Sequence, residues 1–382
     1  MRRAWFYRLA LLATLLGLVV VVLGAYVRLS DAGLGCPDWP VCYGQLTWPG
    51  SEEEISAANQ TFPERPVEAH KAWKEQVHRF FAAGLGTLVL AMALLASWRR
   101  SGRRNLLLAA SLAALAGIFA YIGGLIALAA VLSLLAIGLP LLGALRWPDD
   151  WNARIGAGLL SLVIFQALLG KWTVTLLVKP IIVTGHLLGG MATVALLWWA
   201  TLGSRGWLQA SRPAASGARA LALAALLVVV GQIALGGWTS TNYAALACTD
   251  FPTCHGEWWP EADFAEGFVL WRGLGVDYEF GVLDNPARVA VQLAHRLGAL
   301  VTLVVVLATA LALGLRGGDT VVRIVAAVAG VLVVVQFALG IGNVLLSLPL
   351  PVAVAHNGVA ALLLLSLVTL NHSLRPRASA EA

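Results

Sequence analysis

The sequence predicts an all-α polytopic membrane protein made of two tandem four-helix bundles, with an inserted helical hairpin. Three observations lead to this fold class: the composition, the lengths of the apolar runs and an internal repeat. Of the 382 residues, 59% are hydrophobic and 12% are charged, and the mean hydropathy is +0.80. Soluble domains carry about twice that share of charged residues. The composition therefore indicates a chain whose main solvent is the lipid bilayer.

Eight uncharged runs are each long enough to cross the hydrocarbon core as a helix. They cover residues 9–27, 80–98, 155–170, 181–203, 220–240, 297–315, 324–346 and 352–371. A further run, 106–145, holds 40 residues without a charge, which is roughly twice what one membrane helix needs. We expect a hairpin of two helices there, turning near Gly123 and Gly124. The prediction is thus eight plus two transmembrane helices, the first of which is too long for a signal peptide.

Arginine sets the predicted orientation, because cytoplasmic loops of membrane proteins are enriched in basic residues. Arginines gather before the first span and in every second loop after it. They are Arg2, Arg3, Arg8, Arg99, Arg100, Arg103, Arg104, Arg146, Arg154, Arg205, Arg212, Arg219, Arg316, Arg323, Arg375 and Arg377. We expect a multi-pass protein of the bacterial inner membrane, with both termini in the cytoplasm and the two long loops, 28–76 and 241–290, in the periplasm.

The two halves of the chain repeat each other in the same order. "LGAYVRLSDAGLGC" aligns with "LGGWTSTNYAALAC" at an offset of 212 residues, "VHRFFAAGLG" with "AHRLGALVT" at 217, and "FQALLG" with "VQFALG" at 170. Without the hairpin each half has four spans, so we expect the halves to be related by a pseudo-two-fold axis along the membrane normal. The predicted parts are an N-terminal half 1–203 with outer loop 28–76 and hairpin 106–145, a cytoplasmic linker 204–219, and a C-terminal half 220–382 with outer loop 241–290.

All four cysteines lie in the two outer loops, in the repeated pattern Cys-x-Asp-aromatic-Pro-x-Cys. The periplasm oxidises thiols, so we expect disulfides between Cys36 and Cys42 and between Cys248 and Cys254. The sequence leaves open pairing across the halves. It also leaves open two roles, a structural link or a thiol pair that passes electrons.

Four of the seven histidines occupy equivalent places in the repeat: His78 and His186 in the first half, His295 and His356 in the second. Each is predicted near the outer end of a helix. Two imidazoles facing each other inside a helical bundle can ligate a haem from both sides. The alternative for any one of them is a hydrogen-bonded core residue. A zinc site fits poorly, because each half offers two nitrogens and its thiols are expected to be oxidised.

Charged residues beside these histidines extend the haem interpretation. Arg79 follows His78 and Arg296 follows His295, where a haem propionate would need a cationic partner; simple extension of the side chains to the interface is the alternative. Glu75 stands three residues before His78, whereas the repeat has the amide of Gln292. A carboxylate can accept a proton or stabilise positive charge, so we expect the first half to hold the reaction site. The alternative for Glu75 is a solvated charge near a helix start.

Together these motifs resemble the haem A synthase family over nearly the whole chain apart from the hairpin. The motifs are the two cysteine pairs, "EQVHR" at 75–79, "GKWTVT" at 170–175, "GHLLGG" at 185–190, "AHR" at 294–296 and "AHNGVAALLLL" at 355–365. The family usually has eight spans, so the hairpin is a departure. The resemblance implies oxidation of the C8 methyl group of haem O to the formyl group of haem A.

The resemblance also implies roles for residues and partners. His295 and His356 would hold a resident haem b, His78 and His186 would border the substrate haem O, and Glu75 would take part in the chemistry. Haem O synthase, oxidase-assembly proteins and a second copy of the chain are candidate partners, and no nucleic acid is expected. Two other classes stay open from the residues alone: a di-haem electron carrier linked to quinol, and a transporter.

Overall fold

We describe a computed structural model of the chain, covering residues 2–205, 208–210, 216–316 and 319–375. Within these ranges there are twelve α-helices, ten of which are long and apolar enough to cross a membrane. The ten are α1 (Arg2–Leu29), α3 (Ala69–Ser97), α4 (Ser101–Ile122), α5 (Ile126–Arg146), α6 (Trp151–Thr175), α7 (Pro180–Arg205), α8 (Ser216–Thr241), α10 (Asn285–Arg316), α11 (Thr320–Leu345) and α12 (Leu350–Ser373). Two short helices, α2 (Glu52–Thr61) and α9 (Phe264–Gly267), lie in the long loops.

The count of ten long helices confirms the sequence prediction of eight plus two. Hydrocarbon offers the backbone no hydrogen-bond partner, so an apolar run of this length satisfies its own N–H and C=O groups by forming a helix. The hairpin turns between α4 and α5 at Gly123 and Gly124, as predicted, and Gly124 has φ +75°, a conformation that glycine adopts without steric cost. Arg212, Arg377 and part of the predicted linker 204–219 lie outside the described residues.

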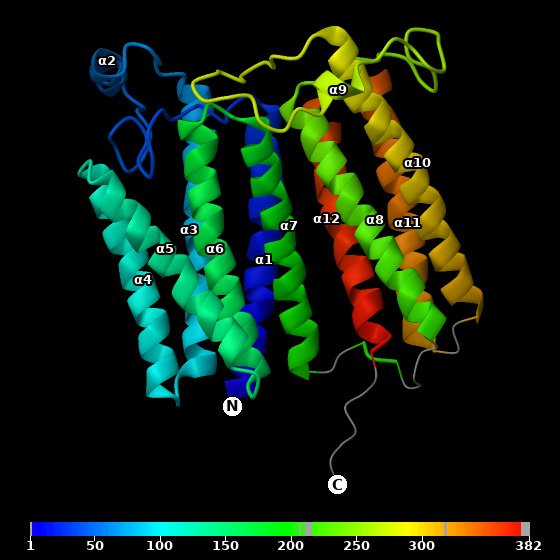
Figure 1. Ribbon diagram of the computed structural model, residues 1–382, viewed down its shortest axis with the longest axis horizontal. Helices are drawn as coiled ribbons and strands as arrows, with labels where there is room; N and C mark the ends of the chain where they lie inside the picture. The colour runs from blue at the N-terminus through cyan, green and yellow to red at the C-terminus, as the bar shows by residue number, and fades with distance from the viewer. Residues whose placement is uncertain (1, 206–207, 211–215, 317–318, 376–382) are drawn as a thin grey trace. The chain divides into compact units, whose positions relative to one another are not determined.

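The chain forms two compact units (Figure 1). The first unit comprises 1–27, 32–175 and 189–205, and the second comprises 28–31, 176–188 and 206–382. The boundaries of this division fall near the end of α1, at the end of α6, inside α7 and after Arg205, the last of these within the predicted linker.

The core of the first unit is built from the four repeated helices with α4 beside them. Its buried residues are Phe6, Ala10 and Ala13 of α1, Leu85, Val89, Met92 and Ala93 of α3, Leu107 of α4, Ile155, Ala157, Leu159 and Leu160 of α6, and Leu197 and Ala200 of α7. Small residues let the helices approach closely. A Cβ atom on Gly156 of α6 would lie 3.0 Å from the Cα atom of Ala93 on α3.

The α4–α5 hairpin packs on this core through polar contacts as well as apolar ones. Arg103 is 9% exposed, and its guanidinium donates to both oxygens of the Asp149 carboxylate at 2.7 and 3.0 Å. Higher along the hairpin, the Ser161 hydroxyl of α6 donates to the Ile137 carbonyl of α5 at 2.8 Å. The hairpin is thus bound to the loop that precedes α6 and to α6 itself.

The second unit contains a four-helix arrangement of α8, α10, α11 and α12. α8 packs against α10 and α12, and α11 packs against the same two helices. Among the described residues, α10 and α12 do not pack extensively on each other, so they stand diagonally across the bundle. This arrangement decides which side chains can face one another in the interior.

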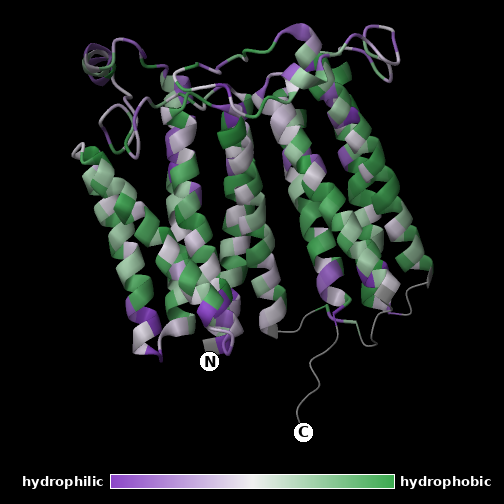
Figure 2. Cartoon of the chain, in the orientation of Figure 1, coloured by the Kyte–Doolittle hydropathy of each residue, from purple (hydrophilic) through white to green (hydrophobic). Residues whose placement is uncertain are grey.

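The long helices consist mainly of hydrophobic residues, and hydrophilic residues gather in the loops and at helix ends (Figure 2). Large apolar residues on the hairpin are strongly exposed, including Leu112 at 65%, Phe119 at 72% and Leu134 at 72%. In water such a surface would be costly, whereas acyl chains solvate it. The arrangement is that of a multi-pass membrane protein.

Candidate functional site: two clasps and two histidine sets

Each cysteine pair closes within its own loop. The sulfur atoms of Cys36 and Cys42 are 2.01 Å apart, and those of Cys248 and Cys254 are 1.98 Å apart. These are the pairs expected from the sequence. We call residues 36–45 the first clasp and 248–257 the second clasp.

An aspartate organises the turn inside each clasp. In the first, the Asp38 carboxylate accepts the backbone N–H groups of Tyr43 and Gly44, both at 2.7 Å. In the second, the Asp250 carboxylate accepts those of His255 and Gly256 at 2.7 and 3.0 Å. The Thr253 hydroxyl also donates to Asp250, and together with the Gly256 N–H this hydrogen bond lowers the pKa of the Asp250 carboxyl. The aspartate of the repeated pattern is therefore a structural acceptor.

Glu75 of α3 anchors the first clasp by a hydrogen bond. It is 5% exposed, and its Oε2 accepts the Cys36 N–H at 2.9 Å. Its Oε1 pairs with Nη2 of Arg79 at 2.5 Å. Arg79 in turn donates through Nη1 to the carbonyl groups of Asp38 and Val41, at 2.9 and 2.7 Å. The carboxylate, the guanidinium and the clasp form one hydrogen-bonded group.

Gln292 of α10 anchors the second clasp at the equivalent place. Its Oε1 accepts the Cys248 N–H, and its Nε2 donates to the Ala245 carbonyl at 2.7 Å. Arg296 donates to the carbonyl groups of Cys248, Asp250 and Thr253 at 3.0, 2.8 and 2.8 Å. This clasp-holding role of Arg79 and Arg296 was missed from the sequence. The signal was available, since the residue pairs 75/79 and 292/296 repeat together with the clasps.

His295 and His356 lie on the diagonal helices α10 and α12 of the second unit. Both residues are half-buried. Each ring rests on a glycine: a Cβ atom would lie 3.1 Å from Cε1 of His295 at Gly236 and 3.2 Å from Cε1 of His356 at Gly340. Any larger residue would push the rings, so the glycines fix where the imidazoles lie.

Two glutamines contact these rings. Gln232 Nε2 of α8 lies 3.0 Å from Nδ1 of His295, and Gln336 Nε2 of α11 lies 3.1 Å from Nε2 of His356. Nδ1 of His356 is buried and has no hydrogen-bond partner among the described residues. Gln336 belongs to the repeated segment "VQFALG", but neither glutamine was predicted to contact a histidine.

His78 lies on α3, in the first unit, and is half-buried. A Cβ atom on Gly24 of α1 would lie 3.1 Å from its Cε1, the same distance as between Gly236 and His295. His186 lies near the start of α7, on the part grouped with the second unit. Nδ1 of His186 is buried without a partner in the described part of the chain. Pairing of His78 with His186 stays a prediction.

Of the other three histidines, His255 is in the second clasp, His70 lies in the first turn of α3, and His372 lies in the last turn of α12, where it is 1% exposed. No group of three or more histidine, cysteine or acidic side chains in the described ranges could hold a metal ion.

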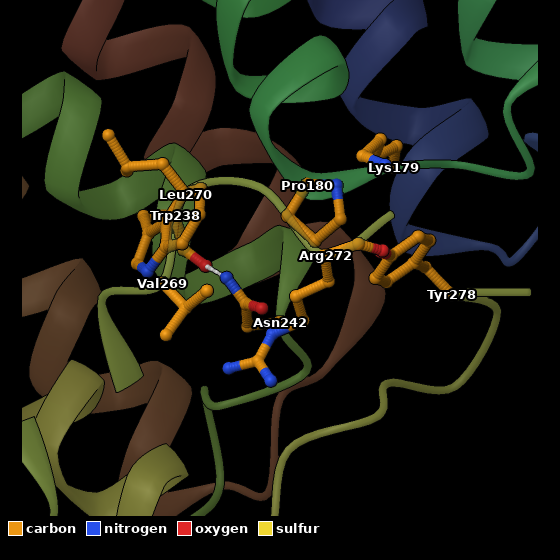
Figure 3. Close-up of a pocket in the computed structure, with 8 residues that line it drawn as sticks. All are labelled: Lys179, Pro180, Trp238, Asn242, Val269, Leu270, Arg272 and Tyr278. Atoms are coloured by element: carbon orange, nitrogen blue, oxygen red, sulfur yellow. Dashed lines mark hydrogen bonds between the residues drawn. The ribbon is translucent and has the colours of Figure 1, made fainter. Parts of the chain in front are cut away.

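A small pocket of the second unit lies at the start of α7 (Figure 3). Lys179 is 2% exposed, and its ammonium lies 3.7 Å from the centroid of the Trp271 ring and donates to the Gly273 carbonyl. Burial lowers the pKa of this ammonium group. Arg272 pairs with the Glu266 carboxylate. The space holds about one water molecule, so it is no site for an organic cofactor.

Comparison with known proteins identifies the family. The family model described as cytochrome oxidase assembly protein (COX15-CtaA) matches residues 7–135 and 121–368. A protein of Shewanella oneidensis named heme A synthase is 39% identical over 383 residues, covering 100% of this chain and 99% of the relative. Proteins of the same name from Rhizorhabdus wittichii and Chelativorans are each 30% identical, covering 97% and 95% of this chain and 94% and 88% of the relatives. The chain belongs to the haem A synthase family.

Membership of this family implies that the chain binds haem, and the second unit fits such a group. A neutral imidazole is a suitable axial ligand of haem iron. His295 and His356 come from helices that stand across the bundle from each other, and a buried, unpartnered ring nitrogen on His356 is a free donor atom. The two histidines are therefore the residues of this unit that could hold the iron.

Proposed function

We propose that this chain oxidises the C8 methyl group of haem O to the formyl group of haem A, for use by terminal oxidases. One observation carries the proposal: in each half, the residue that anchors the clasp stands three residues before a histidine on the same helix. The chain that contains this repeat belongs to the haem A synthase family. In chemical terms, each of two hydroxylations joins a hydroxyl group from water to the methyl carbon and releases two protons and two electrons, and an external electron acceptor takes the electrons. Loss of one water from the resulting diol gives the formyl group.

The substrate site is assigned to the first half. His78 and His186 would border haem O, and Glu75 would act on the reacting carbon from the same helix face as His78. A buried carboxylate stabilises positive charge that develops on a substrate and can accept the proton that is released. Gln292 cannot titrate, which supports assigning the chemistry to the half that contains Glu75.

The resident cofactor is assigned to the second half. His295 and His356 would hold a haem b, which supplies a route for the electrons when bound. Arg296 uses its terminal nitrogens on the second clasp, but its Nε is buried without a partner among the described residues. That N–H is a candidate donor to a propionate of the haem. The guanidinium of Arg79 is the matching candidate in the first half.

The proposed location is the bacterial inner membrane, with the clasps in the periplasm. In the first unit, Arg99, Arg100, Arg103 and Arg104 lie at the opposite end of α3 from the residues that anchor the clasp, which fits the rule that basic loops face the cytoplasm. The oxidising periplasm would also suit the two disulfides.

Co-expression with a source of haem O tests the proposal. We expect chromatography of the extracted haems to give haem A or its alcohol precursor with the wild-type chain. His78→Ala should abolish both products, whereas His70→Ala, on the exposed first turn of the same helix, should not change them. Extraction of haem b alone, at about two per chain, would contradict the proposal and favour an electron carrier.

A further inference from the structure

One polar contact of the histidine-bearing helices has no counterpart in the other half. The repeat offset of 212 residues pairs Gly236 with Gly24, and it pairs Gln232 with Val20. The glycines match in function, since a Cβ atom added to either one would lie 3.1 Å from Cε1 of a histidine. The residue one helical turn before them does not match, because a valine side chain has no hydrogen-bonding atom.

The Gln232 amide faces His295 closely. Its Nε2 lies 3.0 Å from both Nδ1 and the backbone carbonyl oxygen of His295, while its Oε1 is buried without a partner in the described residues. Gly298 makes room for this amide, since a Cβ atom there would clash with its Oε1. The matching position in the first half holds Phe81. Gly298 therefore leaves the space that the Gln232 amide occupies in the second half.

The requirements of iron ligation give this contact a purpose. An imidazole that binds iron through Nε2 carries its proton on Nδ1, and that N–H needs an acceptor that fixes the ring. A half-turn of the Gln232 amide would turn Oε1 towards that N–H, and it would break the hydrogen bond from Nε2 to the His295 carbonyl. Gln166 of the first half and Gln336 of the second half are equivalent in the repeat, so they do not distinguish the two sites.

We infer that Gln232 is a positioning residue that fixes the tautomer and ring orientation of His295, and that it specialises the second half for a haem that is held permanently. Val20 leaves the first half without this contact, as suits a site whose haem must enter and leave. The inference rests on the proposed function.

Three variants test it: Gln232→Leu removes the amide, Gln232→Glu keeps an acceptor, and Val20→Leu is the matched control in the first half. The readouts are the rate of haem transfer from the purified protein to apomyoglobin and the midpoint potential of the bound haem. Loss of such an outer partner weakens metal binding about 10- to 100-fold. We expect Gln232→Leu to release haem faster by that factor with a raised potential. Gln232→Glu should retain haem with a lowered potential, and Val20→Leu should leave both readouts unchanged.

Wild-type rate and potential in Gln232→Leu would overturn the inference while leaving haem A formation, and so the proposed function, intact. If Gln232→Leu does not fold, the glutamate variant decides alone, because an unchanged potential in it would also overturn the inference. A wild-type chain that binds no haem would overturn the proposed function as well.

Discussion

Substitutions of Glu75 can separate its structural role from its chemical role, because the repeat has Gln292 at the equivalent position. The Gln292 amide accepts the Cys248 N–H as the Glu75 carboxylate accepts the Cys36 N–H. In Glu75→Gln we therefore expect the first clasp to stay closed and haem A formation to stop. In Glu75→Leu we expect both to be lost.

The contacts give the magnitudes. A hydrogen bond to a charged group contributes about 1.5–3 kcal/mol and a neutral one about 0.5–1.5 kcal/mol, so Glu75→Gln should weaken the anchor by about 1 kcal/mol. Both variants remove the counter-ion of Arg79. Glutamine keeps an acceptor for the Cys36 N–H, whereas leucine leaves this buried N–H without a partner, which costs about 1–3 kcal/mol. The variants should differ by about that amount, which is roughly 5-fold or more in the opening of the clasp.

Reduction kinetics measure that opening. The purified variants are exposed to a phosphine reductant, and the freed thiols are labelled with a maleimide and located by mass spectrometry. The Cys248–Cys254 pair in the same molecules is the internal control, and extracted haems report activity. Equal opening in the Gln and Leu variants would refute the structural argument. Wild-type haem A in Glu75→Gln would remove the carboxylate from the chemistry.

Three other predictions follow from single contacts. The pKa of Asp250 is lowered, so this carboxylate stabilises the second clasp above about pH 4, and the stabilisation is lost as the pH falls further. The same thiol-labelling assay should detect this loss. Asp250→Asn should remove the pH dependence. Gly236→Val should displace the ring of His295, so the purified protein should show a lower pyridine haemochrome signal per chain, and wild-type haem content would contradict this. Arg103→Met should lower the stability of the hairpin by about 1.5–3 kcal/mol, measured by limited proteolysis of the α4–α5 segment, whereas the more exposed Arg100→Met should cost about 0–1 kcal/mol.

Most of the fold could be predicted from the sequence, because an apolar run in lipid satisfies its backbone hydrogen bonds by forming a helix. The run 106–145 had to turn, and Gly123 and Gly124 were the residues able to make that turn. The disulfide pairs followed from the repeat and from the spacing of the cysteines. Helix ends were less accurate, because polar residues at the interface, such as those of 69–79, continue the helix without adding to the apolar run.

The candidate site was less predictable because its contacts join distant segments. Arg79 and Arg296 were given to haem propionates on the basis of position alone, and the clasp carbonyls that they bind depend on how the loop folds back over the helix. Gln232 was missed for a different reason. The repeat points to residues that the two halves share, and a glutamine that occurs in only one half does not stand out in it.

The anchors of the clasps place a constraint on biogenesis. Glu75 and Gln292 each lie less than one helical turn before a histidine, so the fold of an extracytoplasmic loop and the seating of an imidazole depend on the same stretch of backbone. On the proposed topology, the cysteines meet their oxidant only after translocation across the bilayer. We therefore expect maturation to be sequential, with thiol oxidation preceding stable haem retention. Pulse-chase labelling should find no haem-loaded chain whose clasps are still reduced.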